Sequence, residues 1–144
     1  MTAPPAIPDI QQQTDTDHLK LLVVFHYIVA GFAVLGLGFV LLHYTIMHAI
    51  MTNPEIWKNH KGGGPSPVLF FDLFRWIYLG MGVLLVAGGV SNLLSALFLR
   101  KRQHRIFSLI VAGINCAQFP IGTALGVFTF IVLMRNSVKE SYGD

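Results

Sequence analysis

The chain has 144 residues, of which 53% are hydrophobic and only 12% are charged, whereas about 25% of an ordinary soluble domain is charged. This composition excludes a water-soluble globule, because too few polar side chains are present to cover its surface. The net charge of +3 does not indicate a nucleic-acid partner, since the basic residues flank apolar runs instead of forming a stripe with aromatics. The composition predicts a polytopic membrane protein surrounded by lipid.

The amino-terminal segment, residues 1–17, is rich in proline, glutamine and acidic side chains and has no apolar core. Such a tail is usually disordered on its own, and it lacks the pattern of a secretory signal. We expect it to be a cytoplasmic tail. Asp15, Thr16 or Asp17 is predicted to cap a helix that begins near His18, because short side-chain oxygens accept hydrogen bonds from the free amides of a first turn.

The first apolar run predicts a membrane span over about residues 19–51. As a continuous helix it would be about 50 Å long, which exceeds the bilayer, so it must tilt or extend into water. Gly31, with Gly36 and Gly38, narrows this helix. Small residues let a second helix approach closely in lipid, so Gly31 is predicted to lie at a helix-packing contact.

A polar segment, residues 52–66, follows the first span. Asn53 before Pro54 predicts the start of a short helix, and Trp57 suits the headgroup zone. Residues 62–65 read Gly-Gly-Gly-Pro, which is typical of a turn. They are not a phosphate-binding loop, because the Gly-Lys-Ser/Thr ending and the flanking strand are missing.

A second span is predicted over about residues 67–99, with Ser66 as its cap and Pro67 at its first position. Asp72 and Arg75 are three residues apart and therefore neighbours on the helix. We expect them to form an interfacial ion pair beside an aromatic belt; a proton or substrate site would require the pair to lie deep in the membrane. The predicted helix-packing face consists of Ala87, Ser91 and Ser95, with Asn92 beside them.

A basic loop separates the second span from the last apolar region and contains Arg100, Lys101, Arg102 and Arg105. Such loops stay in the cytoplasm, which places the loop after the first span outside. Residues 135–140 are also basic beside an apolar span. Both termini are therefore predicted to be cytoplasmic, with an even number of crossings after Arg105.

The last apolar region, residues 106–134, is uncharged and has Pro120 near its centre. Because basic residues flank this region on both sides, an even number of crossings is expected. This favours two short spans, about 102–119 and 120–138, followed by a cytoplasmic tail at 140–144. Pro120 fits a helix start, and Thr123 is expected to satisfy free backbone groups. A re-entrant hairpin gives the same parity, and a single kinked helix is the remaining alternative. Helix packing is predicted at Asn115, Gln118, Gly122 and Gly126.

The whole pattern is that of an all-α, polytopic transmembrane four-helix bundle, with two long helices before a short hairpin broken by proline and glycine. His26-Tyr27, the basic loop, and the run Phe-Pro-Ile-Gly-Thr-Ala-Leu-Gly-Val-Phe-Thr at 119–129 resemble a group of small uncharacterised bacterial four-span inner-membrane proteins. The likeness covers most of residues 19–139. It implies a bacterial inner-membrane location and assigns no functional residue.

Histidines are the candidate cofactor ligands within the membrane, namely His26, His43 and His48. His26 and His48 lie roughly 33 Å apart along one helix, and no facing histidine exists in the later spans. A haem therefore requires two subunits, whereas a chlorin with one axial ligand is less restricted. The ordinary interpretation is that these histidines form hydrogen bonds with backbone carbonyls or lipid headgroups at the interface. Cys116 stands alone in an apolar run, which is typical of packing rather than metal binding.

Three classes of function follow from these patterns. We expect a non-catalytic accessory or scaffold subunit of a larger membrane complex, because the chain has small-residue packing faces and short loops. The alternatives are a homo-oligomeric channel or transporter lined by Asn92, Asn115 and Gln118, and a pigment- or haem-binding subunit. An enzyme is disfavoured, since no carboxylate pair, Cys/His dyad or metal-spaced cluster occurs at one depth.

Overall fold

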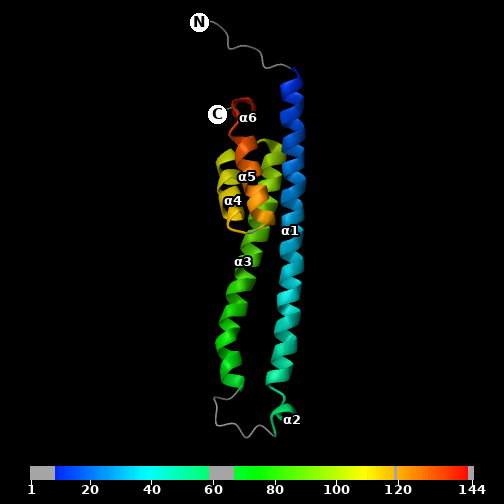
Figure 1. The fold of residues 1–144 in the computed structure, drawn as a ribbon, viewed down its shortest axis with the longest axis vertical. Coiled ribbons are helices and arrows are strands. Elements are labelled where there is room, and N and C mark those ends of the chain that lie inside the picture. The colour runs from blue at the N-terminus through cyan, green and yellow to red at the C-terminus, as the bar shows by residue number, and fades with distance from the viewer. Residues whose placement is uncertain (1–8, 59–66, 119, 143–144) are drawn as a thin grey trace. The chain divides into compact units, whose positions relative to one another are not determined.

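The computed structural model describes residues 9–58, 67–118 and 120–142, and every regular element in them is an α-helix (Figure 1). The all-α class is confirmed over these residues, where no strand is present. The helices are α1 (Asp9–Met51), α2 (Pro54–Trp57), α3 (Pro67–Lys101), α4 (Arg105–Cys116), α5 (Ile121–Leu133) and α6 (Asn136–Ser141).

Two helices, Ile10–Met51 and Phe71–Lys101, are long and apolar enough to cross a membrane. The chain divides into two compact units. The first, which we call the bundle unit, contains residues 1–30 and 90–144, and the second, the two-helix unit, contains residues 31–89. Each unit is described below by itself.

Within the described residues the helix α1 begins at Asp9, and not near His18 as its sequence predicted. Thr14 and Thr16 donate hydrogen bonds to the carbonyls of Ile10 and Gln12, each over 2.8 Å. Each hydroxyl therefore donates to a carbonyl four residues earlier in the same helix, and neither one caps the start of a helix. Residues 9–17 of the expected tail are helical, while residues 1–8 lie outside the described part.

The short helix predicted after the first span is present as α2. The Asn53 side chain accepts a hydrogen bond from the Glu55 amide over 3.0 Å, which satisfies a free donor of the first turn. The Trp57 indole donates to the Ile50 carbonyl over 3.1 Å, so it holds α2 against the end of α1. The expected Gly-Gly-Gly-Pro turn and the Ser66 cap lie outside the described residues.

The last apolar region forms a hairpin of two helices, α4 and α5, that run in opposite directions (Figure 1). The Thr123 hydroxyl donates to the Cys116 carbonyl over 2.8 Å, which satisfies a free group at the end of α4 as expected. A Cβ added to Gly126 would lie 2.4 Å from the Ala112 carbonyl oxygen. The two helices thus pack backbone to backbone, which a single kinked helix does not do.

The two helices of the hairpin are shorter than the spans that the sequence predicted. Their 12 and 13 residues make them about 18 and 20 Å long. Arg135 is extended, with φ −63° and ψ 139°, so α5 ends at Leu133 and α6 is a separate helix. The region expected as one span over 120–138 is therefore two helices.

The core of the bundle unit is aliphatic. Its fully or nearly buried side chains are Leu19, Leu22, Leu99, Leu125, Val132, Leu133 and Val138. They come from α1, α3, α5 and α6, so the segments at the two ends of the chain share one core. Burial of each such side chain contributes about 1.5–3 kcal/mol where water is the reference.

The two-helix unit is held by aromatic contacts between α1 and α3. Tyr44 packs on Phe71 and Tyr78, with ring centroids 5.4 Å apart in both cases. Gly36 lies against Leu85, because a Cβ added there would be 3.3 Å from the leucine Cδ2. Most of the other large hydrophobic side chains on these two helices are exposed, which is typical of helices surrounded by lipid or by other helices.

Candidate functional site

A buried amide pair lies inside the bundle unit. Asn92 of α3 donates to Asn115 of α4 over 3.1 Å, and Asn115 donates back over 2.8 Å. Their side chains are 2% and 0% exposed, so the amides are withdrawn from solvent. These bonds fix the register of α3 against α4. They also weigh against a pore lined by the two asparagines, since each amide is directed at the other.

The other predicted packing residues fall into two groups. Ser95, Gly122 and Gly126 are buried inside the bundle unit, and Ser91 is partly buried. Gly31 and Ala87 are exposed, so they pack on nothing within their own unit. Gln118 is also exposed and makes no hydrogen bond through its side chain in the described structure, in contrast to the interhelical bond expected of it.

A polar hollow of about 490 Å³ lies where α6 meets the first turns of α1. Asp15, only 5% exposed, accepts hydrogen bonds from Arg135 over 3.1 Å and from Ser137. The same guanidinium lies 3.2 Å from His18 Nδ1. The buried Asp15 carboxylate therefore links the amino-terminal part of α1 to residues 135–137 near the carboxyl terminus. Sequence analysis missed this role because the partners are 120 residues apart.

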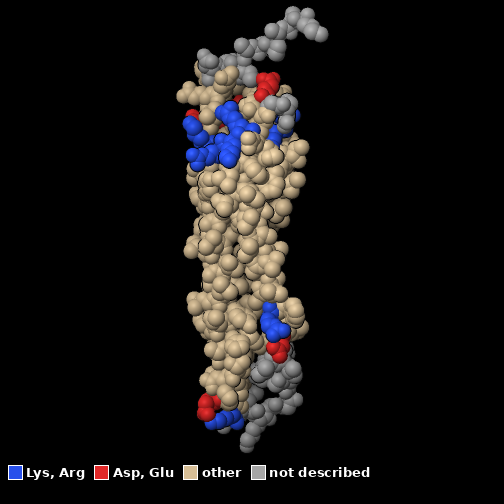
Figure 2. All heavy atoms as spheres, turned by 180° about the vertical axis from the view of Figure 1, so that it is seen from behind, with Lys and Arg blue, Asp and Glu red and all other residues tan. Residues whose placement is uncertain are grey.

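The basic residues of the bundle unit gather at one end of it (Figure 2), and one of them, Arg102, lines this hollow. Arg102 donates to the Thr16 hydroxyl over 3.0 Å, and Arg105 donates to the Leu133 carbonyl over 2.9 Å, which satisfies the end of α5. Burial raises the pKa of Tyr142 to about 12, although Arg102 and Arg105 oppose the shift. The tyrosine hydroxyl is therefore neutral at physiological pH.

The three histidines considered as cofactor ligands differ in access. His26 is fully buried, and its Nδ1 donates to the Leu22 carbonyl over 2.9 Å, so its imidazole is not exposed at the surface of the bundle unit. In the two-helix unit, His43 Nδ1 is 2.7 Å from the Tyr78 hydroxyl. His48 is exposed and packs against Tyr44 and Phe71. The two accessible imidazoles are thus already engaged in an aromatic cluster.

The interfacial ion pair expected of Asp72 and Arg75 is not formed. Both side chains are exposed, and no salt bridge joins them in the described structure. The Arg75 guanidinium instead lies 5.7 Å from the centre of the Trp76 ring, a cation–π contact of about 0.5–1 kcal/mol at an exposed site. This geometry suits the headgroup zone and provides no proton-transfer pair.

No family model, curated protein or solved structure matches this chain. The described residues contain no group of three or more His, Cys, Asp or Glu side chains that could hold a metal ion. The guanidinium and hydroxyl groups at the polar end of the bundle unit are hydrogen-bond donors of the kind that hold anions in other proteins.

Proposed function

We propose that this chain is a non-catalytic accessory or scaffold subunit of a larger complex in the bacterial inner membrane. The observation that supports this function best is an exposed stripe on α1 in the two-helix unit. Gly31, Leu35, Gly38 and Leu42 follow one another at intervals of four and three residues, so they share one face of the helix. Leu35 and Leu42 are 69% and 59% exposed.

The glycines on this stripe favour a protein partner over lipid. Nothing lies within 4 Å of a Cβ added at Gly31 or Gly38, so neither glycine is required by packing inside its own unit. Glycine in a helix interior is less favourable than alanine by about 1 kcal/mol. Lipid tails gain little from glycine, whereas a second helix can approach closely beside it.

The helix α3 carries a stripe of the same kind in the two-helix unit. Its members are Leu73, Ile77, Gly80, Leu84 and Ala87, spaced by four and three residues along the helix. All are exposed, Leu84 by 74%, and nothing lies within 4 Å of a Cβ added at Gly80. Two such stripes give the chain surfaces for more than one neighbouring helix.

The proposed orientation places the basic end of the bundle unit in the cytoplasm, with both termini. The basic loop and Arg135 support it, because positive charge beside apolar spans is retained on that side. The hairpin of α4 and α5 is too short to cross a core of roughly 30 Å, so it enters and returns on the cytoplasmic side. A tag placed after Asp144 is then accessible to a protease from the cytoplasm alone, and cleavage from the outside would contradict this topology.

The subunit role is tested by recovery of the tagged chain from its own membranes in a mild detergent, followed by native mass spectrometry. We expect the wild-type chain to bring other membrane proteins with it and Gly38→Leu to lose them, because the added side chain fills the space beside the helix. Leu42→Ile keeps the volume of the stripe and should retain the partners.

Three outcomes would overturn the subunit role or change it. A wild-type chain recovered only as a 15.9 kDa monomer contradicts it, as does retention of all partners by Gly38→Leu. Multiples of the monomer mass alone indicate a homo-oligomer instead. The isolated Gly38→Leu chain should keep its thermal stability, since the substituted position contacts nothing within its unit.

A further inference from the structure

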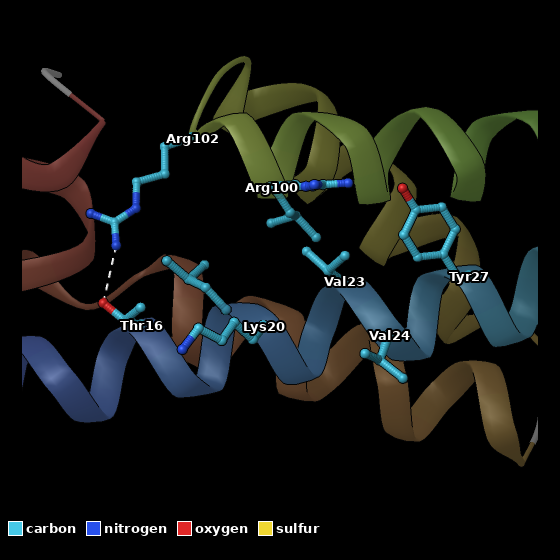
Figure 3. A pocket seen from close by; sticks show the side chains of 9 residues that line it. Thr16, Lys20, Val23, Val24, Tyr27, Arg100 and Arg102 are labelled. Carbon is cyan, nitrogen blue, oxygen red and sulfur yellow. Dashed lines mark hydrogen bonds between the residues drawn. The ribbon is translucent and has the colours of Figure 1, made fainter.

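An open groove of about 490 Å³ lies between the first part of α1 and the end of α3, within the bundle unit. Its walls are apolar and consist of Leu19, Val23, Val24, Tyr27 and Leu99. Figure 3 shows Val23 and Tyr27 projecting from α1 toward α3. This apolar part of the groove suits a hydrocarbon chain, because its side chains have few polar groups to satisfy.

Three cationic side chains also line the groove, Lys20, Arg100 and Arg102. Lys20 is paired with Asp17 over 3.1 Å at an exposed position, where such a pair contributes little. Arg102 holds the neutral hydroxyl of Thr16. Arg100 makes no ion pair with any described residue. The lining of the groove thus has more positive than negative charge and attracts an anion.

The groove has basic residues near the end of α3 and apolar walls farther along, as a phospholipid has a charged headgroup followed by acyl chains. Lys20 and Tyr27 are seven residues apart on α1, which is about 10 Å along the axis. The basic residues are at the end of α3, next to the turn that leads to α4, and the apolar walls extend from there toward the middle of the helices. A water-soluble anion would use the basic end and leave the apolar walls uncovered.

We propose that this groove binds one anionic phospholipid, with its phosphate between Arg100 and Arg102 and an acyl chain along Val23 and Tyr27. Arginine suits this role, because the planar guanidinium donates two parallel hydrogen bonds to phosphate oxygens. The inference rests on the membrane location proposed above, but it does not depend on the subunit role. The ligand is identified by two features together, the negative charge of its headgroup and its hydrocarbon chain.

The test is a native mass-spectrometric titration of the purified, detergent-solubilised chain with phosphatidylglycerol and with phosphatidylcholine of the same acyl chains. We expect one phosphatidylglycerol to bind more tightly than phosphatidylcholine. Arg100→Gln should weaken phosphatidylglycerol about fivefold, since one basic residue near a headgroup contributes about that factor. Lys101→Gln removes the same charge from the adjacent position, which does not line the groove, and should leave the affinity unchanged.

Two further probes separate the lipid from other ligands. Glycerol phosphate carries the anion without the chains and should not bind at concentrations that saturate the lipid; binding of equal strength would make this a soluble-phosphate site. Val23→Trp should fill the groove and abolish binding of the lipid. Equal affinity for both lipids, or equal effects of Arg100→Gln and Lys101→Gln, would overturn the proposal. Because the isolated chain is used, these results are independent of whether partner subunits are recovered.

Discussion

Replacement of Gly126 with alanine is expected to lower the free energy of unfolding by about 1–3 kcal/mol, the usual effect of overpacking. The added Cβ would lie 2.4 Å from the Ala112 carbonyl oxygen and 2.5 Å from the Cys116 sulfur. Carbon and oxygen atoms do not approach this closely without a shift of the backbone. The carbonyl belongs to α4, whose hydrogen bonds resist such a shift, so the hairpin must open.

This prediction is measured by thermal unfolding in one detergent, with Gly113→Ala as the control. Gly113 is also a helical glycine of the hairpin, but a Cβ there would meet only the Phe130 ring at 3.9 Å, an ordinary contact. Alanine is the better helix former by about 1 kcal/mol, so Gly113→Ala should unfold at the same temperature as wild type or higher. Equal stability of the two variants would contradict the close approach of α4 and α5.

The second large effect is expected at the buried amide pair. Asn115→Ala removes both bonds to Asn92, at an expected loss of about 1–3 kcal/mol, because each such bond contributes about 0.5–1.5 kcal/mol. The double variant Asn92→Ala/Asn115→Ala should be more stable than the sum of the single effects predicts. The expected coupling is about 1 kcal/mol, in the range of interhelical hydrogen bonds within membranes.

A double-mutant cycle with the same unfolding assay measures this coupling. Gln118→Ala is the matched control, because it removes an exposed amide near the tip of the hairpin and should change stability by less than about 0.5 kcal/mol. Strict additivity of the two asparagine variants would mean that the bonds contribute nothing beyond the separate side chains. In that case the register of α3 against α4 would have to come from the other packed side chains of the bundle unit.

Local features of the fold could be predicted where the interactions that produce them lie within one short segment. Asn53 before Pro54 predicted α2, since capping and the fixed proline φ act within one turn. The two long apolar runs predicted helices long enough to cross a membrane, and α1 and α3 meet that expectation. The start of α1 was predicted too late, because Asp15 and Thr16 are good caps in isolation.

The candidate sites were less accessible to sequence reasoning. Asp15 was interpreted as a cap, yet its carboxylate binds Arg135 and Ser137 of the distant carboxyl-terminal segment. Asp72 and Arg75 have the spacing of an ion pair, yet Arg75 turns to the Trp76 ring. Spacing along one helix states which side chains can meet. It does not state which of several nearby partners has the lowest free energy.

Composition and the length of the apolar runs are sufficient to predict two helices long and apolar enough to cross a membrane, because both act through bulk transfer from water and need no knowledge of contacts. For residues 106–134 the flanking charges favoured two helices but did not exclude one kinked helix. Only the tertiary structure decided this, by placing Gly126 against the Ala112 carbonyl and Asn115 against Asn92. The reason is that close packing and reciprocal hydrogen bonds depend on distances between segments, and no local pattern in the chain specifies those distances.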